Sequence, residues 1–225
     1  MSAEGEISAG APGLIETLRV DAQGVPLRLD RHLRRLAHCA AALGIPCAIT
    51  EVRRQVRAVA EKVARENESR QGCRLRVLLR ADGGLEVTGQ PLPDGWPPTL
   101  PVPVILSSVQ VNSTDPLLRC KTTRREHFDR AWAEASRKGA AEALLRNERG
   151  ELTEGTRTNI FLRRNGRWLT PPAAAGLLPG ILRAELLERG EAEERTLRPE
   201  DLADGELHIG NALRGLLPAR LVWRP

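Results

Sequence analysis

The stretch that organises this sequence reads Thr153-Glu154-Gly155-Thr156-Arg157-Thr158-Asn159-Ile160-Phe161. It follows a turn signal, Asn147-Glu148-Arg149-Gly150, and runs into β-branched and aromatic residues that favour a strand. A carboxylate at the start of a strand, followed by glycine and small hydroxyl residues, can form the edge of a binding pocket. Taken alone, Glu154 is more often a solvated turn residue, so its meaning depends on the rest of the chain.

The length and composition indicate a soluble globular protein with one large or two small domains. The chain has 225 residues, of which 41% are hydrophobic and 28% are charged. No apolar run approaches the length of a membrane span, and the first residues do not resemble a signal peptide. We therefore expect a cytoplasmic protein without a membrane partner.

The distribution of charge and the spacing of cysteines and histidines argue against two further classes of function, nucleic-acid binding and metal binding. The net charge of +5 is spread along the chain, and only 3% of residues are aromatic, which argues against a nucleic-acid partner. The four cysteines and four histidines show no metal-ligand spacing, so we expect no metal site. Cys39, Cys47, Cys73 and Cys120 are expected to be reduced.

The order of expected elements indicates two α+β domains. A strand over 14–20 and a returning strand over 25–29 read as a hairpin, and later segments read as alternating helices and strands. Six prolines between Pro91 and Pro103 indicate a linker. The expected units are an N-terminal domain over 1–92, a linker over 93–103 and a C-terminal domain over 104–225.

Lys121 is the most unusual of the basic residues. The chain has 34 lysine and arginine residues in total, and only three of them are lysines. Lys62 and Lys138 lie in charged helical stretches, whereas Lys121 precedes Thr122-Thr123, at the expected start of a helix over 122–138. A lysine can lose its proton and form an imine, which an arginine cannot do, although the spacing alone is more often explained by a surface lysine at the start of a helix.

Two glycine-led segments could bind a phosphate. Gly180-Ile181 begins an expected helix, whose N–H groups and dipole favour an anion, and Gly210-Asn211-Ala212 could form a second backbone cradle. Arg35 could supply a counter-charge. Each segment also has an ordinary structural explanation. Together, an imine-forming lysine, a phosphate cradle and a carboxylate are the groups that pyridoxal phosphate (PLP) requires.

An ordered set of motifs resembles the class IV aminotransferase family, the fold-type IV PLP enzymes. The matching segments cover about residues 14–218 and appear in the family's order. They are Ile15-Glu16-Thr17-Leu18-Arg19-Val20, His32-Leu33-Arg34-Arg35-Leu36, Lys121-Thr122-Thr123, Glu154-Gly155-Thr156-Arg157-Thr158-Asn159-Ile160-Phe161, Thr170-Pro171-Pro172, Gly176-Leu177-Leu178-Pro179-Gly180-Ile181-Leu182-Arg183 and Gly210-Asn211-Ala212-Leu213-Arg214-Gly215.

The resemblance implies a fold and a cofactor. The expected fold is the two-domain α+β architecture of fold-type IV, similar to D-amino acid aminotransferase. Members are typically homodimers and bind PLP. Lys121 is implied as the Schiff-base lysine, Glu154 as the partner of the pyridine nitrogen, and Arg35 as a ligand of the phosphate.

Further cofactor contacts are implied by the same motifs. Backbone N–H groups of Ile181 and Leu182, and of Asn211 and Ala212, are expected to complete the phosphate cup, with Asn159 also beside the cofactor. The family usually has a hydroxyl residue where Leu182 stands, so one side-chain contact to the phosphate is expected to be missing. About 13 residues precede the first matching strand, fewer than is usual in the family, so we expect part of the pocket wall or dimer surface to differ.

The Asn-Ala-Leu-Arg-Gly segment and the spacing of Lys121 and Arg125 are similar to the aminodeoxychorismate lyases of this family. The activity implied is elimination of pyruvate from 4-amino-4-deoxychorismate, which gives 4-aminobenzoate for folate biosynthesis. Lys121 would move the proton, with help from Thr17. Substrate-binding candidates are Arg125, Arg157, Thr158 and Arg214.

Two alternatives remain open from the sequence. The first is a branched-chain or D-amino-acid aminotransferase. Those enzymes usually place a tyrosine beside the cofactor, and this chain has no tyrosine. The second is a relative of the family that has no catalytic activity.

Overall fold

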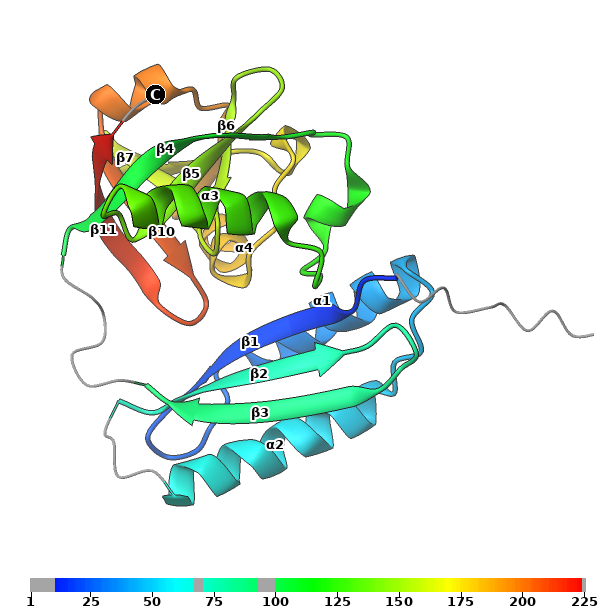
Figure 1. The fold of residues 1–225 in the computed structure, drawn as a ribbon. Coiled ribbons are helices and arrows are strands. Elements are labelled where there is room, and N and C mark those ends of the chain that lie inside the picture. Colours follow the sequence, from blue (N-terminus) through cyan, green and yellow to red (C-terminus); the bar gives the residue numbers. More distant parts are fainter. Residues whose placement is uncertain (1–10, 67–70, 93–99, 224–225) are drawn as a thin grey trace, which may run out of the picture. The chain divides into compact units, whose positions relative to one another are not determined.

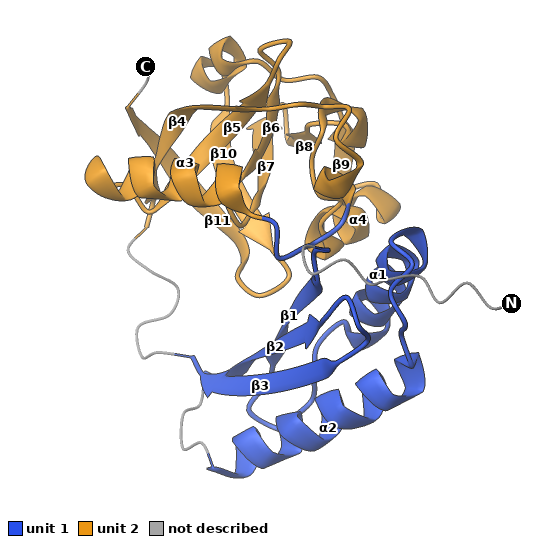
Figure 2. Ribbon diagram, turned by 45° about the vertical axis from the view of Figure 1, so that its right-hand side comes forward, with its two compact units in different colours: residues 1–96, 120–124 blue, residues 97–119, 125–225 orange. Residues whose placement is uncertain are grey.

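The computed structural model describes residues 11–66, 71–92 and 100–223. They form two compact units, which Figure 2 distinguishes by colour. Unit 1 comprises residues 1–96 and 120–124, and unit 2 comprises residues 97–119 and 125–225. Most of the predicted proline-rich linker, residues 93–99, lies outside the described residues.

Unit 1 is a three-stranded antiparallel sheet with two helices along it (Figure 1). Its strands, in spatial order, are β1 (Leu14–Val20), β2 (Cys73–Leu79) and β3 (Leu85–Pro91). Its helices are α1 (Leu29–Ala42) and α2 (Ile49–Glu66), where the helical spacing of apolar residues predicts helices over about 31–43 and 51–67. Each helix buries apolar residues at helical spacing against the sheet, which forms one core.

The chain turns back after β1 as predicted, with Asp21 N donating to Val25 O at 3.0 Å, but the predicted returning strand over 25–29 does not form. Only Val20 and Pro26 form a bridge, Leu27 N donates to Arg19 O at 2.8 Å, and α1 begins at Leu29. Pro26 has no N–H to donate to a strand ladder, which the sequence reading overlooked. The partner of β1 is instead β2, with Leu14 opposite Leu79 and Val20 opposite Cys73.

Residues 120–124 belong to unit 1, whereas the sequence reading placed them in the domain over 104–225. They run along β1: Ile15 N donates to Lys121 O at 2.7 Å, Thr123 N donates to Gly13 O at 2.8 Å, and Leu14 and Thr122 form a bridge. These extended contacts use backbone groups that a helix would need. The helix predicted over 122–138 therefore begins only at Glu126.

Unit 2 contains an eight-stranded sheet in which one strand closes a ring. The spatial order is β10-β11-β4-β5-β6-β7-β8-β9, and β10 pairs with β7 as well as with β11. The strands are β4 (Val102–Val111), β5 (Glu142–Asn147), β6 (Leu152–Gly155), β7 (Asn159–Arg164), β8 (Arg167–Thr170), β9 (Ala192–Glu194), β10 (Glu206–Asn211) and β11 (Gly215–Trp223). Apolar residues of the ring strands, such as Val104, Leu144, Ile160 and Ile209, form a buried cluster.

Two helices pack on this sheet (Figure 1). The helix α3 (Glu126–Arg137) buries Ala131 and Ala135 in a cluster with residues of β4 and β5, and the short helix α4 (Ile181–Glu188) packs in a cluster with Phe161 of β7. Among the described residues, no helix combines the length and the apolar character needed to cross a bilayer. The helices and the closed ring of strands together fix the positions of the residues at which the loops of unit 2 begin and end.

Candidate active site

The turn between β6 and β7 presents Glu154 as a buried carboxylate. Glu154 pairs with Asn159 across the turn, and Gly155 N donates to Thr158 O at 2.7 Å. The residue is only 5% exposed, and its Oε1 accepts a hydrogen bond from Leu178 N at 3.0 Å. Glu154 is therefore not the solvated turn residue that its sequence context alone would favour.

A second buried carboxylate, which the sequence reading missed, holds this turn. Glu142, at the start of β5, is fully buried, and it accepts hydrogen bonds from the backbone N and the hydroxyl of Thr156 at 2.8 and 2.5 Å. It also accepts one from the Thr158 hydroxyl at 3.0 Å. A side chain at Gly155 would collide with Thr158 and Glu142. The one sequence signal was a charge placed directly before the apolar run Ala143–Leu145.

The start of α4 lies beside the start of β7. Gly180 is the N-cap residue and has no side chain, so it provides no side-chain cap for the first N–H groups of the helix. Asn159 Nδ2 donates to Leu178 O at 2.9 Å, and a side chain at Gly180 would collide with the Asn159 amide. Ile181 and Leu182 occupy the first turn, where an anion would be stabilised.

The side chain of Leu182 faces the core. It packs in the apolar cluster with Phe161 and Leu186. The only group of Leu182 that the first turn can offer to an anion is therefore its backbone N–H, and the missing hydroxyl contact to a phosphate stays a prediction.

Asn211, at the end of β10, links a third loop to the same place. Its Oδ1 accepts the N–H groups of Leu213 at 3.1 Å and Arg214 at 2.9 Å, which shapes the turn that contains Ala212. Its Nδ2 donates to Arg157 O at 2.9 Å. In addition, Gly210 lies opposite Asn159 in the sheet, and a side chain at Gly210 would meet Leu182. Unit 2 thus brings the Glu154 turn, the α4 start and the Asn211 turn together.

Two of the predicted substrate-binding arginines lie at the Glu154 turn. Arg125 donates to Thr156 O at 2.7 Å, and the Arg157 guanidinium lies 3.9 Å from the centre of the Trp132 ring. Burial is the largest influence on Arg125 and lowers its pKa; Asp129 opposes this shift, and the nearby charge of Arg157 adds to it. Two close guanidinium groups, one of them partly desolvated, favour an anionic ligand.

The other two substrate-binding candidates have different surroundings. Thr158 is buried and its hydroxyl is bonded to Glu142, so the hydroxyl already has a protein partner. Arg214 is half-buried in the turn after β10, where its N–H is bonded to Asn211. The substrate-binding roles of Thr158 and Arg214 stay predictions.

The remaining predicted residues belong to unit 1. Lys121 is half-buried in the segment that runs along β1, and Thr17 is half-buried in β1. Side chains alternate along a strand, so Thr17 lies on the opposite face of β1 from Glu16. The roles of Lys121 and Thr17 stay predictions.

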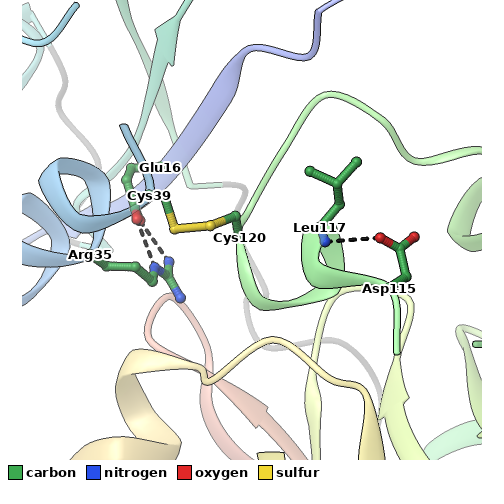
Figure 3. The surroundings of a disulfide bond; sticks show 6 residues. All are labelled: Glu16, Arg35, Cys39, Asp115, Leu117 and Cys120. Carbon is green, nitrogen blue, oxygen red and sulfur yellow. Dashed lines mark hydrogen bonds and ion pairs between the residues drawn. A yellow bond between two sulfur atoms is a disulfide. The ribbon is translucent and has the colours of Figure 1, made fainter. Parts of the chain in front are cut away.

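Arg35 forms a buried ion pair with Glu16 (Figure 3). Its Nε and Nη2 donate to the two carboxylate oxygens of Glu16, both at 2.7 Å, and His32 Nδ1 lies 2.7 Å from Glu16 Oε2. Burial raises the pKa of Glu16, but the charge and hydrogen bonds of Arg35 and the hydrogen bond from His32 outweigh it, so the pKa is lowered to about 2. The phosphate-binding role of Arg35 stays a prediction.

The expectation that all cysteines are reduced is wrong for two of them. Cys39 of α1 and Cys120 form a disulfide across 81 residues of sequence, with a Cα–Cα distance of 5.7 Å (Figure 3). Cys47 and Cys73 are not part of a disulfide. Connectivity at this separation cannot be deduced from spacing. The disulfide attaches the residue directly before Lys121 to α1.

Comparison with known proteins places this chain among the fold-type IV enzymes. A family model described as "Amino-transferase class IV" matches residues 13–222. A protein of Schizosaccharomyces pombe named "Putative aminodeoxychorismate lyase" is 31% identical over 222 residues, which cover 94% of this chain and 90% of the relative.

Solved structures show the same fold. A crystal structure titled as a "Putative amino-acid aminotransferase" from Mesorhizobium loti has a TM-score of 0.84 and 39% identity, covering 94% of this chain and all of that chain. A hypothetical aminotransferase from Mycobacterium tuberculosis, with α-ketoglutarate and PMP bound, has a TM-score of 0.82 at 21% identity, covering 98% and 84%. The predicted two-domain α+β fold of fold-type IV is confirmed.

Proposed function

Since the chain belongs to the class IV aminotransferase family, we propose that it is a PLP-dependent lyase that eliminates pyruvate from 4-amino-4-deoxychorismate to give 4-aminobenzoate. The observation that carries the proposal is the convergence in unit 2 of a buried carboxylate, an uncapped helix start and the Asn211 turn. The likeness to the Schizosaccharomyces pombe protein favours the lyase within the family.

The groups present suit PLP. Glu154 is a buried carboxylate that could hold a proton on the pyridine nitrogen, and the uncapped N–H groups at Ile181 and Leu182 suit a phosphate. The turn containing Asn211 and Ala212 would complete the phosphate site, with Arg35 as its counter-charge. Lys121 would hold the cofactor covalently. When bound, PLP supplies an electron sink for the charge left when a proton leaves carbon.

Proton movements would fall to unit 1 residues. Lys121 Nζ would take the ring proton from the substrate carbon that bears the amine, and the ring carbon–oxygen bond would break with its electron pair moving to oxygen, which releases the enolate of pyruvate. Lys121 Nζ or the Thr17 hydroxyl would return a proton to the departing enolate, which gives pyruvate. Formation of the aromatic ring makes the overall step favourable.

Substrate binding would depend on the cationic side of the Glu154 turn. The substrate carries two carboxylates. Arg125, the residue before α3, donates to Thr156 O of this turn, and Arg157 of the turn packs on Trp132 with its charge acting on Arg125. Thr158 and Arg214 are further candidates. A guanidinium group can bind a carboxylate through two parallel hydrogen bonds, which fixes orientation as well as charge.

An amino-acid aminotransferase is the second candidate. The observation in its favour is the 39% identity to the Mesorhizobium loti protein, which is described as a "Putative amino-acid aminotransferase". The absence of tyrosine from this chain argues against it, because aminotransferases of the family usually place a tyrosine beside the cofactor. A relative without catalytic activity is the third candidate.

Cofactor binding is the first test. The purified protein, supplied with PLP, should be yellow, and borohydride should abolish the visible absorbance and leave the cofactor attached to a peptide that contains Lys121. The Lys121→Ala variant should take no covalent label. A wild-type protein that remains colourless with added PLP would contradict the proposal for every enzyme of this type.

Product analysis separates the two enzymatic candidates. The lyase should form equal amounts of pyruvate and 4-aminobenzoate from 4-amino-4-deoxychorismate without a keto acid. The aminotransferase should show amino transfer only when a keto acid is present, and should give no 4-aminobenzoate. A PLP-loaded protein that does neither supports the third candidate.

We also propose that the protein is a homodimer, which rests on the family resemblance. Light scattering should give a mass near twice the 24.7 kDa of the chain. A mass that stays at the monomer value at high concentration would contradict this part of the proposal.

A further inference from the structure

We propose that Glu142 is a positioning residue that directs Glu154 toward the cofactor and fixes the arginine-bearing turn beside it; this inference rests on the proposed function. Glu142 lies on β5, one strand away from Glu154 on β6. It has no predicted contact with substrate or cofactor. Its role follows from what its carboxylate holds.

The Glu142 carboxylate is almost entirely occupied by the turn. Oε1 accepts from Thr156 N, the Thr156 hydroxyl and Ala143 N, at 2.8, 2.5 and 3.0 Å. Oε2 accepts from the Thr158 hydroxyl at 3.0 Å and Arg157 N at 3.3 Å. Four of these five donors belong to the turn that follows Glu154. The side chain therefore binds a whole loop rather than one neighbour.

All five of these donors are neutral groups, and the Glu142 carboxylate that accepts their hydrogen bonds is fully buried. Burying a charge is costly unless hydrogen bonds compensate for the lost water, and five donors fill the capacity of two carboxylate oxygens. In a glutamine at position 142, an NH2 group would replace one carboxylate oxygen. This NH2 group would face the N–H and O–H donors of the turn, so the hydrogen bonds to that oxygen would be lost. The charge of Glu142 thus matches the donors that the turn presents.

The hydrogen bonds to Glu142 hold the turn in one conformation. This conformation sets the orientation of Glu154, Arg157 and Arg125, which have predicted roles in the site. Glu154 comes immediately before the turn, with Leu178 N on Oε1, and Gly155 is packed so closely against Glu142 that a side chain would collide with it. On the other side, Arg157 carries its guanidinium over Trp132, and Arg125 donates to Thr156 O. Release of the Glu142 contacts would loosen both the carboxylate and the two arginines.

The test compares Glu142→Gln with a matched control, Glu134→Gln. Glu134 is also a buried carboxylate of unit 2, and it accepts from the hydroxyls of Ser107 and Ser108 and from Ser108 N, at 2.7, 3.1 and 3.0 Å. These bonds attach α3 to β4 and do not involve the turn. Both variants should lower the melting temperature, whereas only Glu142→Gln should affect the cofactor.

Four measurements should separate positioning from simple stability. In Glu142→Gln, amide exchange at Thr156 and Arg157 should accelerate, the PLP dissociation constant of the apoprotein should rise about tenfold, and kcat should fall about 10²-fold with little change in KM. The pH midpoint of the visible absorbance should also shift. Glu134→Gln should keep PLP affinity and kcat within about twofold, as expected of a site away from the turn.

Thr156→Val provides a second variant in case Glu142→Gln does not fold. It removes one O–H donor to Glu142 and keeps the size of the side chain, so smaller changes in the same direction are expected. If the folded variants bind PLP and turn over as the wild type does, the inference is overturned while the proposed function stands. If the wild type itself takes up no PLP, the proposed function and this inference fall together.

Discussion

Residues 120–124 and residues 154–159, which carry Lys121 and Glu154, are held by different kinds of contact. The first segment is joined to α1 by the Cys39–Cys120 disulfide and to β1 by backbone hydrogen bonds. The second depends on the noncovalent bonds of Glu142 and Asn159. A reductant breaks the disulfide, whereas replacement of Glu142 by a neutral residue weakens the hydrogen bonds of the second segment. Separate perturbations should therefore reach the two segments independently.

Lys121→Ala should have the largest effect and tests whether the disulfide-held segment carries the chemistry. Turnover should fall by about 10⁴-fold or more, because both the cofactor attachment and the proton transfer are lost. Steady-state assays with saturating PLP measure this effect. Lys62→Ala, an exposed lysine on α2, is the control and should keep full activity. Comparable activity in the two variants would remove Lys121 from the mechanism.

Glu154→Gln tests the carboxylate-held segment and should have the next largest effect. Turnover should fall by about 10³-fold, because a neutral amide cannot stabilise a protonated pyridine nitrogen. The melting temperature should change little, since the amide keeps an oxygen for Leu178 N. Stopped-flow absorbance and thermal unfolding provide the two measurements. Unchanged turnover would show that the electron-sink assignment is wrong.

Removal of the disulfide should lower the stability of unit 1. Cys39→Ser should lower the free energy of unfolding by about 2–4 kcal/mol, because a cross-link restricts the unfolded chain. Urea unfolding with and without reductant measures it, and reductant should bring the wild type to the level of the variant. Cys47→Ser is the control for a free cysteine. A wild type that is insensitive to reductant and equal to Cys39→Ser would contradict the cross-link.

The Glu16–Arg35 pair should give the smallest change, which depends on pH. The folded pKa of Glu16 is about 2, below its usual value of 4.5, so its stabilising effect is complete above pH 4.5 and is lost as pH falls toward 2. Between pH 7 and pH 3 this loss is about 2 kcal/mol. In Glu16→Gln the decrease in unfolding free energy over that range should be smaller by this amount. Equal decreases in variant and wild type would contradict the lowered pKa.

The sequence predicted the parts of the fold that depend on local periodicity. The strand over 14–20 and the helices of unit 1 were located because their apolar residues recur at strand and helix spacing. The closure of the ring by β10 and β7, the pairing of β1 with β2 and the disulfide were not predictable in this way. Each depends on contacts between residues far apart in the chain.

The candidate site shows the same division. Glu154, Asn159 and Asn211 could be named because each lies in a motif whose order along the chain resembles a known family. Glu142 could not, because four of its five hydrogen-bond donors belong to residues that follow it by 14 to 16 positions, and its own context is a single charge before an apolar strand. The burial of the Glu142 carboxylate can be recognised only in the folded structure, where β5 and the turn lie side by side.

The ring in unit 2 also bears on how the protein avoids aggregation. Because β10 pairs on both sides, the strand left at the edge of this sheet is β9, which is three residues long and carries Glu193 and Glu194. Long, flat and apolar edge strands recruit other chains into intermolecular sheets, and short charged edges resist this. Replacement of Glu193 by valine would therefore make this edge more prone to intermolecular pairing. Glu194 has a second role, because it also pairs with the buried Arg183 of α4 and accepts a hydrogen bond from Ala173 N.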